Sequence, residues 1–383
     1  MMINRGILYR LSIFIIFFYI AVAFLAPFIA GDTPIICLNN GVISLPIINS
    51  GIRNEISEGS KCLMPLIPFS TQNIDPKYKT GISPFDKRQS GVFKSRHWMG
   101  TDKLGRDVAS AMVHGSAIAL KIGFLSVFFS FIIGVSLGMA AGYYQDNSIK
   151  MSWIQLSADF LFFITGVYYM WMEFIVFNDS FYLFLLGSIF VMICLIILHK
   201  LTGKFVTLYQ FYVPVDIVIV KIIEIRKSFP GIFLLLALIS IFRVPSVWNI
   251  VIIITILSWA DFARLTRGDT LSIKNENYII SAQVLGFSDI RIMWRHILPN
   301  ILPTLIVAVC FSIGGAVILE STLSFLGIGL PVEEVSWGKL MAEGRNMRYW
   351  WLVFFPGLAI FVLVLSLNSI ASAWQKSNFN MFS

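Results

Sequence analysis

Residues 278–300 read YIISAQVLGFSDIRIMWRHILPN, and this polar stretch lies between two long apolar segments. The pattern predicts two short helices with a glycine hinge between them at Gly286. Ser288 is placed to cap the second helix, and Pro299 is placed to end it. Helical spacing also predicts that four apolar side chains share one face, namely Ile290, Met293, Trp294 and Ile297. We therefore expect an exposed docking element that a membrane helix holds at each end.

The stretch resembles the EAA loop of bacterial ABC importer permeases, in which E-A-A and a glycine precede I-x-L-P. It is most similar to the loop of the OppC/DppC type, which serves importers of dipeptides, oligopeptides and some nickel complexes. The likeness covers these positions: Leu285, Gly286, Ser288, Asp289, Arg295, His296, Ile297, Leu298, Pro299 and Asn300. The chain departs from the pattern at Ile280 and Ser281, where the family usually has glutamate and alanine.

The resemblance implies that this loop docks in a groove on a separate ATPase subunit. By the same resemblance, the docking surface is expected to contain Ser281, Ala282, Gln283, Leu285, Gly286, Asp289, Ile297, Leu298 and Pro299. The alternative, on the residues alone, is an ordinary pair of amphipathic helices that lies at the membrane interface.

The composition excludes a soluble domain. The chain has 383 residues, of which 57% are hydrophobic and 13% are charged. Apolar runs of about 20 residues recur along it, and a bilayer core of about 30 Å requires helices of that length. The formal net charge of +8 fits basic cytoplasmic loops better than nucleic-acid binding, because the basic residues are scattered among apolar spans.

The sequence predicts no bound cofactor. No Walker-type glycine loop is present, so we expect the chain to bind no nucleotide by that device. The four cysteines lack the spacing of metal ligands, and we expect no metal site. Under the resemblance, ATP and magnesium belong to the partner ATPase subunits.

The N-terminal region is expected to place a loop outside the membrane. Residues 1–30 are predicted to form a transmembrane anchor, although the segment could also be a signal peptide. Residues 31–107 contain the longest polar segment and are expected to form an external loop. Cys37 and Cys62 in this loop either form a disulfide or remain as two free thiols.

Residues 97–107 read HWMGTDKLGRD and resemble the GTDxLGRD signature of the same permease type. The matching residues are Gly100, Thr101, Asp102, Gly105, Arg106 and Asp107. Thr101 or Asp102 can cap a short helix, and Asp102 can form an ion pair with Arg106. A metal site is disfavoured, because the carboxylates lie beside an arginine and only one histidine is near. The resemblance gives this signature segment no catalytic role.

Residues 115–145 are predicted to form a core transmembrane helix, in which Gly134 and Gly138 allow another helix to approach closely. Residues 150–210 depart from the family, which passes to its next span within a few residues. This insertion contains two apolar runs, residues 160–177 and residues 181–198. The runs predict an inserted membrane hairpin, and the alternative is a pair of interfacial segments.

Residues 211–375 are predicted to complete the permease core, with the cytoplasmic docking loop at 275–300. The first span of this part is expected to cover residues 215–242. Three charged residues near its start are expected to be ion-paired at the inner interface, namely Asp216, Lys221 and Glu224. Glu320 lies well inside a later span, where it either lines the passage or pairs with a partner helix.

The resemblance implies an all-α, polytopic membrane helical bundle, the type I fold of ABC importer permeases with an inserted helical hairpin. It implies a permease subunit and not an enzyme, which forms half of the translocation pathway for dipeptides or oligopeptides. The implied partners are a homologous second permease, two ABC ATPase subunits, an external solute-binding protein and membrane lipid, without nucleic acid. The implied location is the bacterial inner membrane, with both chain termini in the cytoplasm.

Three alternatives stay open. The same architecture could import nickel chelates or another small solute. A transporter driven by an ion gradient would favour broken helices and membrane-embedded carboxylates without a docking loop. A polytopic membrane enzyme would need paired catalytic groups near one membrane face, whereas the apolar spans offer isolated ones.

Overall fold

The structure is a computed structural model. It describes residues 5–39, 42–44, 46, 61–71, 74, 81–84, 86, 96–146, 150–152, 164–166, 187, 190, 193–194, 197, 210–242 and 244–379. The two apolar runs of the expected hairpin lie outside these residues apart from short pieces. The hairpin therefore stays a prediction.

Helices dominate the described chain and confirm the prediction of an all-α membrane bundle. Among the described residues, five helices are long and apolar enough to cross a bilayer: Ile7–Phe24, Val108–Tyr144, Val247–Ile273, Asp289–Phe325 and Trp350–Gln375. The helices are α1 (Arg5–Phe24), α2 (Ala26–Ile29), α3 (Val108–Tyr144), α6 (Val215–Ser228), α7 (Gly231–Ile241), α8 (Val247–Ile273), α9 (Asn277–Val284), α10 (Asp289–Ile292), the π-helix η3 (Met293–Ile297), α11 (Leu298–Phe325), α12 (Trp337–Met347) and α13 (Trp350–Phe379). The strands are β1 (Ile36–Asn39), β2 (Val42–Ser44), β3 (Lys61–Leu63), β4 (Lys150–Ser152) and β5 (Gln210–Tyr212).

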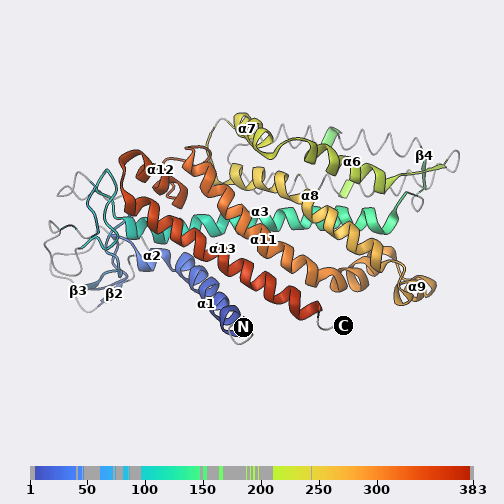
Figure 1. Ribbon diagram of the computed structural model, residues 1–383, viewed down its shortest axis with the longest axis horizontal. Helices are drawn as coiled ribbons and strands as arrows, with labels where there is room; N and C mark the ends of the chain where they lie inside the picture. Colours follow the sequence, from blue (N-terminus) through green and yellow to red (C-terminus); the bar gives the residue numbers. More distant parts are fainter. Residues whose placement is uncertain are drawn as a thin grey trace.

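Helix α3 runs through the bundle, and α8 packs along it (Figure 1). The contact is close because glycines of α3 face the backbone of α8. A Cβ atom at Gly134 would lie 2.4 Å from the Trp259 carbonyl oxygen, and one at Gly138 would lie 2.4 Å from the Ala263 carbonyl oxygen. The predicted role of this glycine pair is therefore confirmed, since only a residue without a side chain permits this approach.

Helix α3 begins earlier than the predicted range of 115–145. The Asp107 carboxylate accepts a hydrogen bond from the Ser110 N–H (2.7 Å) and so caps a helix that starts at Val108. The prediction that Thr101 or Asp102 caps a helix here is wrong, because the N-cap position belongs to Asp107.

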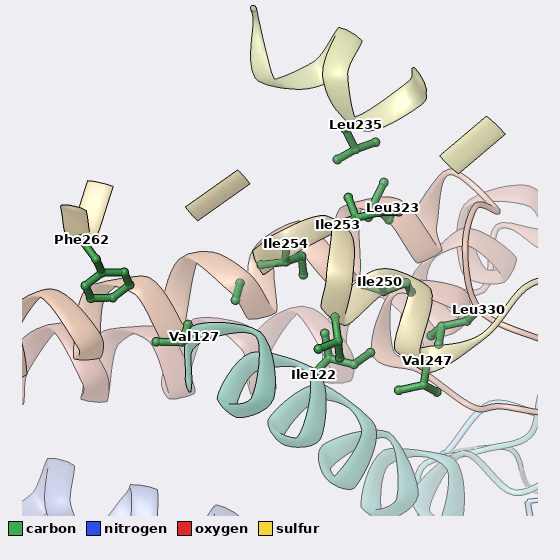
Figure 2. Close-up of a cluster of buried hydrophobic side chains, with 12 residues drawn as sticks. Ile122, Val127, Leu235, Val247, Ile250, Ile253, Ile254, Phe262, Leu323 and Leu330 are labelled. Atoms are coloured by element: carbon green, nitrogen blue, oxygen red, sulfur yellow. The ribbon is translucent and has the colours of Figure 1, made fainter. Parts of the chain in front are cut away.

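A buried apolar cluster joins α3, α7, α8 and α11, and Figure 2 shows its side chains pointing toward one another. Ile122 and Val127 come from α3, while Ile250 and Ile254 come from α8. Because lipid tails are as apolar as these side chains, the cluster stabilises the bundle by close packing more than by exclusion of water.

The span expected at 215–242 is two helices. Helix α6 ends at Ser228, and Pro230 occupies the N-cap position of α7. Phe229 between them is extended, with φ −81° and ψ 123°. The residue before a proline is disfavoured in helical conformation, which explains the break.

The predicted ion pairing near the start of α6 is confirmed in part. Lys221 and Glu224 form an exposed pair at 2.8 Å. Asp216 instead binds Arg267 of α8 through two hydrogen bonds of 2.5 and 2.6 Å. This bidentate contact joins α6 to α8. The spacing of charged residues along α6 does not reveal Arg267 as the partner of Asp216.

The external segment contains a small sheet of strand order β2-β1-β3 at one end of the molecule, opposite to α9 (Figure 1). Cys37 of β1 and Cys62 of β3 lie opposite each other and form a disulfide. Of the two alternatives that the sequence left open for these cysteines, the structure contains the bonded one.

Candidate functional site

The loop between α8 and α11 turns at Gly286, as the sequence predicts. The Gly286 N–H donates to the Gln283 carbonyl (2.9 Å), and the Phe287 N–H donates to the Ala282 carbonyl (3.2 Å). These two bonds form the Schellman motif, which ends a helix at a residue with left-handed backbone. Gly286 has φ +76°, a conformation that glycine adopts without the steric cost of a side chain.

The second helix of the loop differs from its prediction at both ends. Ser288 occupies the N-cap position of α10, but its side chain makes no capping hydrogen bond. The prediction that Pro299 ends the helix is wrong, because α10 continues through η3 into α11 and Pro299 lies in the first turn of α11. Proline is tolerated in the first turn of a helix.

One side of the loop is buried against α3. Buried side chains of the loop form one apolar cluster with α3 and α11. The loop contributes Ile279, Ala282, Ile292, Met293 and Ile297, α3 contributes Val135, Met139 and Tyr143, and α11 contributes Ile301 and Leu305. Two of the nine predicted docking residues, Ala282 and Ile297, therefore hold the loop in place and do not form its surface. Leu298 is partly buried, and the other six are exposed.

The predicted apolar face of the second helix is divided. Met293 and Ile297 are buried, whereas Ile290 and Trp294 are exposed. The π-helical segment η3 explains the difference, since its wider turn changes the angle between successive side chains and breaks the 3.6-residue period. Such segments occur frequently at functional sites.

The outer side of the loop carries large apolar side chains that are between 45% and 82% exposed, and we name this set the exposed loop surface: Ile280, Val284, Leu285, Ile290 and Trp294. Exposed apolar residues that gather on one element mark an interaction site. Val284 is absent from the predicted set because the family pattern does not single it out, although it lies beside Leu285 at the end of α9.

Polar contacts fasten the loop to the inner end of α3. The Tyr143 hydroxyl donates to the Asp289 carboxylate (2.8 Å), and the Gln283 amide donates to that hydroxyl (3.4 Å). Lys274 donates to the Tyr143 carbonyl (2.5 Å). Burial lowers the pKa of Lys274, and the nearby Asp289 carboxylate opposes this shift. Gln283 and Asp289, both predicted docking residues, thus also position the loop.

The signature segment forms a closed turn at the outer end of α3. The Asp102 N–H donates to the Arg106 carbonyl (3.0 Å). The Val108 N–H donates to the Gly100 carbonyl (3.1 Å). Gly100 and Gly105 have φ of +78° and +85°, values that favour glycine.

Two buried carboxylates hold this turn together. Asp102 accepts the N–H groups of Leu104 (2.9 Å) and Arg106 (2.8 Å). Its predicted ion pair with Arg106 is confirmed, with Nε 2.5 Å from the carboxylate. Asp107, which caps α3, also lies 2.8 Å from Nδ1 of His97. These hydrogen bonds give both aspartates a structural role in the turn.

The same segment joins three helices. The Thr101 hydroxyl accepts from the Ile82 N–H (2.9 Å), and the Thr101 carbonyl accepts from the indole of Trp351 in α13 (3.0 Å). The Lys103 N–H donates to the Glu343 carboxylate of α12 (2.8 Å). Burial raises the pKa of Glu343, and the Lys103 N–H opposes that shift. The signature segment is therefore a structural joint between α3, α12 and α13.

Glu320 is fully buried near the outer end of α11. Its carboxylate accepts hydrogen bonds from the hydroxyls of Ser324 (2.9 Å) and Ser321 (3.2 Å). The side chain of Ser336, the N-cap residue of α12, also hydrogen-bonds to it. The partners of Glu320 that the structure describes thus belong to its own chain, and its role in a passage or a pairing with another subunit stays a prediction.

The described residues contain no group of three or more histidine, cysteine, aspartate or glutamate side chains that could hold a metal ion. What the loop offers is an exposed apolar surface fastened to the membrane helices. Such a surface can bind a protein partner and transmit its movement.

The C-terminal part of the chain is similar to a known protein family. Residues 201–377 match the family model described as "Binding-protein-dependent transport system inner membrane component". The matched range contains α6 to α12 and most of α13, and so includes the loop and Glu320.

Two curated relatives extend the likeness over most of the chain. "Glutathione transport system permease protein GsiD" of Pectobacterium atrosepticum is 29% identical over 317 residues, which cover 82% of this chain and 82% of the relative. "Dipeptide transport system permease protein DppC" of Alkalihalophilus pseudofirmus is 28% identical over 285 residues, which cover 74% of this chain and 71% of the relative. The solved structure "Inward facing conformations of the MetNI methionine ABC transporter" aligns with a TM-score of 0.44 and 17% identity, over 70% of this chain and 97% of that chain.

Proposed function

We propose that this chain forms half of a peptide translocation pathway in the bacterial inner membrane, because residues 201–377 match the model of binding-protein-dependent transport system inner membrane components and a curated relative is a dipeptide permease. The chain is a permease subunit of an ABC importer, and its long apolar helices give it a multi-pass membrane location. The names of its relatives, which transport dipeptides and glutathione, support peptides as the substrate class.

The exposed loop surface is the observation that carries the proposal. It offers five large apolar side chains on a segment that joins two membrane-spanning helices directly. An ABC ATPase subunit would cover these side chains. ATP and magnesium would bind to the two ATPase subunits and not to this chain, which has no Walker-type loop.

The attachment of the loop supports a mechanism for coupling. Its buried side packs on α3, and its ends continue into α8 and α11. A movement of the ATPase subunits would therefore displace three spans together, as closely packed elements shift between discrete arrangements and do not deform continuously. ATP binding would close the ATPases and change the pathway between its inward- and outward-facing states.

The orientation of the bundle in the membrane would decide where the other partners bind. The end with α9 would face the cytoplasm, together with both chain termini, and the end with β1 to β3 would face outward (Figure 1). A homologous second permease would complete the pathway. An external solute-binding protein would deliver the peptide to the outward end.

The substitution Leu285→Arg tests this proposal. Leu285 is 72% exposed, and a charge in the centre of an apolar interface costs a few kcal/mol, so ATPase association should fall at least about tenfold. Val332→Arg is the matched control, since Val332 is 88% exposed and lies in the connection between α11 and α12, far from the loop. The measurements are co-purification of the ATPase subunits in mild detergent and uptake of a labelled dipeptide by cells.

We expect Leu285→Arg to lose ATPase subunits and dipeptide uptake while its membrane insertion is unchanged, and Val332→Arg to retain both. Full ATPase recruitment by Leu285→Arg would overturn the docking assignment. A deletion strain that retains dipeptide uptake but loses nickel uptake would overturn the peptide assignment and leave the docking surface standing.

A further inference from the structure

A groove lies between α8 and α11, and Lys227 of α6 also lines it. Its volume is about 560 Å³, and Phe311 and Ser312 of α11 form one of its walls. The lining residues of α8 and α11 belong to the segments that are long and apolar enough to cross the membrane. The signature segment and the exposed loop surface contribute no residue to it.

Four charged side chains line the groove, and their formal charges cancel. They are Lys227, Asp261, Arg264 and Asp269. Lys227 lies 2.6 Å from the Asp261 carboxylate and Arg226 lies 3.6 Å from it, so Asp261 is neutralised within the chain. Among the described residues, neither Arg264 nor Asp269 has an ion-pair partner, and Oδ2 of Asp269 is buried without a hydrogen bond. One positive and one negative group therefore remain unpaired in the same groove.

An unpaired charge inside a membrane-spanning helix is expensive when it faces lipid. Arg264 and Asp269 both line the groove. This side of α8 is therefore suited to a water-filled space or to a polar ligand of its own. A ligand with one positive and one negative group would match both side chains.

We propose that Arg264 binds the carboxylate and Asp269 the ammonium group of a short zwitterionic peptide that passes through the membrane. This inference rests on the proposed function and names the residues that contact its substrate. The two residues are five positions apart on α8, which corresponds to about 7.5 Å along the helix axis. An extended dipeptide spans about 7 Å, which is similar to this axial offset of the two backbone positions.

The surroundings of the two charged groups leave room for such a ligand. Gly268 lies between them on α8, and a Cβ atom at this position would have no neighbour within 4 Å. Phe311 and Leu265 supply apolar walls for peptide side chains. Few directed polar groups in a largely apolar cavity are typical of small-molecule sites.

Two kinds of variant test the assignment. Asp269→Asn removes the negative charge, whereas Asp269→Glu retains it. Gly268→Leu adds an apolar side chain to the groove at a position where the Cβ atom meets no neighbour within 4 Å. Glu224→Gln is the matched control, because Glu224 belongs to an exposed ion pair on α6 and does not line the groove.

The measurement uses the complete importer in proteoliposomes: this chain, the second permease, both ATPases and the binding protein. Uptake of a labelled dipeptide and the ATP hydrolysis stimulated by the binding protein are followed together. We expect Asp269→Asn and Gly268→Leu to lower uptake at least about tenfold, the range that the loss of a hydrogen bond to a charged group gives, with ATP hydrolysis retained. Glu224→Gln should transport like the wild type, and Asp269→Glu, which keeps the negative charge, should retain more uptake than Asp269→Asn.

Wild-type uptake by Asp269→Asn and Gly268→Leu would overturn the assignment of this groove and leave the proposed function intact. A parallel loss of uptake, ATP hydrolysis and second-permease association would overturn it too, because the groove would then be a subunit contact. If the wild-type importer takes up no peptide, the proposed function fails, and the groove assignment fails with it.

Discussion

At the scale of single residues, Gly286 links local conformation to function. Its φ of +76° ends α9 and directs the chain into α10, which places Leu285 and Ile290 on the exposed loop surface. No atom lies within 4 Å of a Cβ built at Gly286. Backbone strain alone therefore decides which residues this position accepts.

We expect Gly286→Val to weaken ATPase association and Gly286→Asn to be tolerated. A left-handed backbone costs residues with a side chain about 1–2 kcal/mol, and asparagine adopts it more readily than valine does. Thermal stability in detergent and co-purification of the ATPase subunits measure both effects. Identical behaviour of the two variants would show that the left-handed turn is unimportant for docking.

At the scale of helices, the contact of α3 with α8 is the rigid part of the bundle. Three glycines of α3 face α8, namely Gly134, Gly138 and Gly142. A Cβ atom at Gly142 would lie 2.7 Å from Cβ of Thr270 on α8. The side-chain hydroxyl of Thr255 on α8 adds a hydrogen bond to the Ser126 carbonyl of α3 (3.2 Å). Since α8 continues into the loop, this packing lets a force on the loop reach the centre of the bundle.

The variant Gly138→Val should destabilise the protein by about 1–3 kcal/mol, the usual cost of overpacking a tight contact. The new Cβ atom would meet the Ala263 carbonyl oxygen, which is backbone and cannot move alone. Gly357→Val is the control, because Gly357 lies in α13 with no neighbour within 4 Å. The melting temperature in mild detergent distinguishes them, and equal shifts would contradict the role of the α3–α8 contact.

At the scale of the whole molecule, the small sheet of β1 to β3 and the loop lie at opposite ends (Figure 1). The end with the small sheet is held by the signature segment and by the disulfide between Cys37 and Cys62. His114 of α3 approaches the Ala30 carbonyl (2.9 Å), which joins α3 to the chain between α2 and β1. A binding protein would thus meet a surface that is cross-linked and anchored.

Replacing both Cys37 and Cys62 by serine should destabilise the external sheet by about 3 kcal/mol, the contribution of a disulfide that closes a loop of this order of length. The cysteines are 25 residues apart in sequence. Limited proteolysis of the external segment measures the effect, with Cys310→Ser in α11 as the control. If reductant does not change the proteolysis rate of the wild type, the disulfide does not stabilise this region.

Much of the candidate site could be predicted because it depends on consecutive residues. Gly286 was predicted as the hinge, and Asp102 as the partner of Arg106, since both features arise within a few positions of the chain. The face of the second loop helix was not predicted correctly, because η3 interrupts the regular period between Ile290 and Ile297. Met293 and Ile297 of this segment pack with α3, a contact that the regular period does not predict.

The sequence by itself determined the five long apolar helices and the position of the loop, because apolar length and glycine conformation are local properties of the chain. Only the tertiary structure decided that Asp216 binds Arg267, that Ala282 is buried, and that Arg264 and Asp269 share one groove. These contacts depend on how helices cross and how they are rotated about their axes. Crossing and rotation are set by the packing of side chains that lie far apart in the sequence.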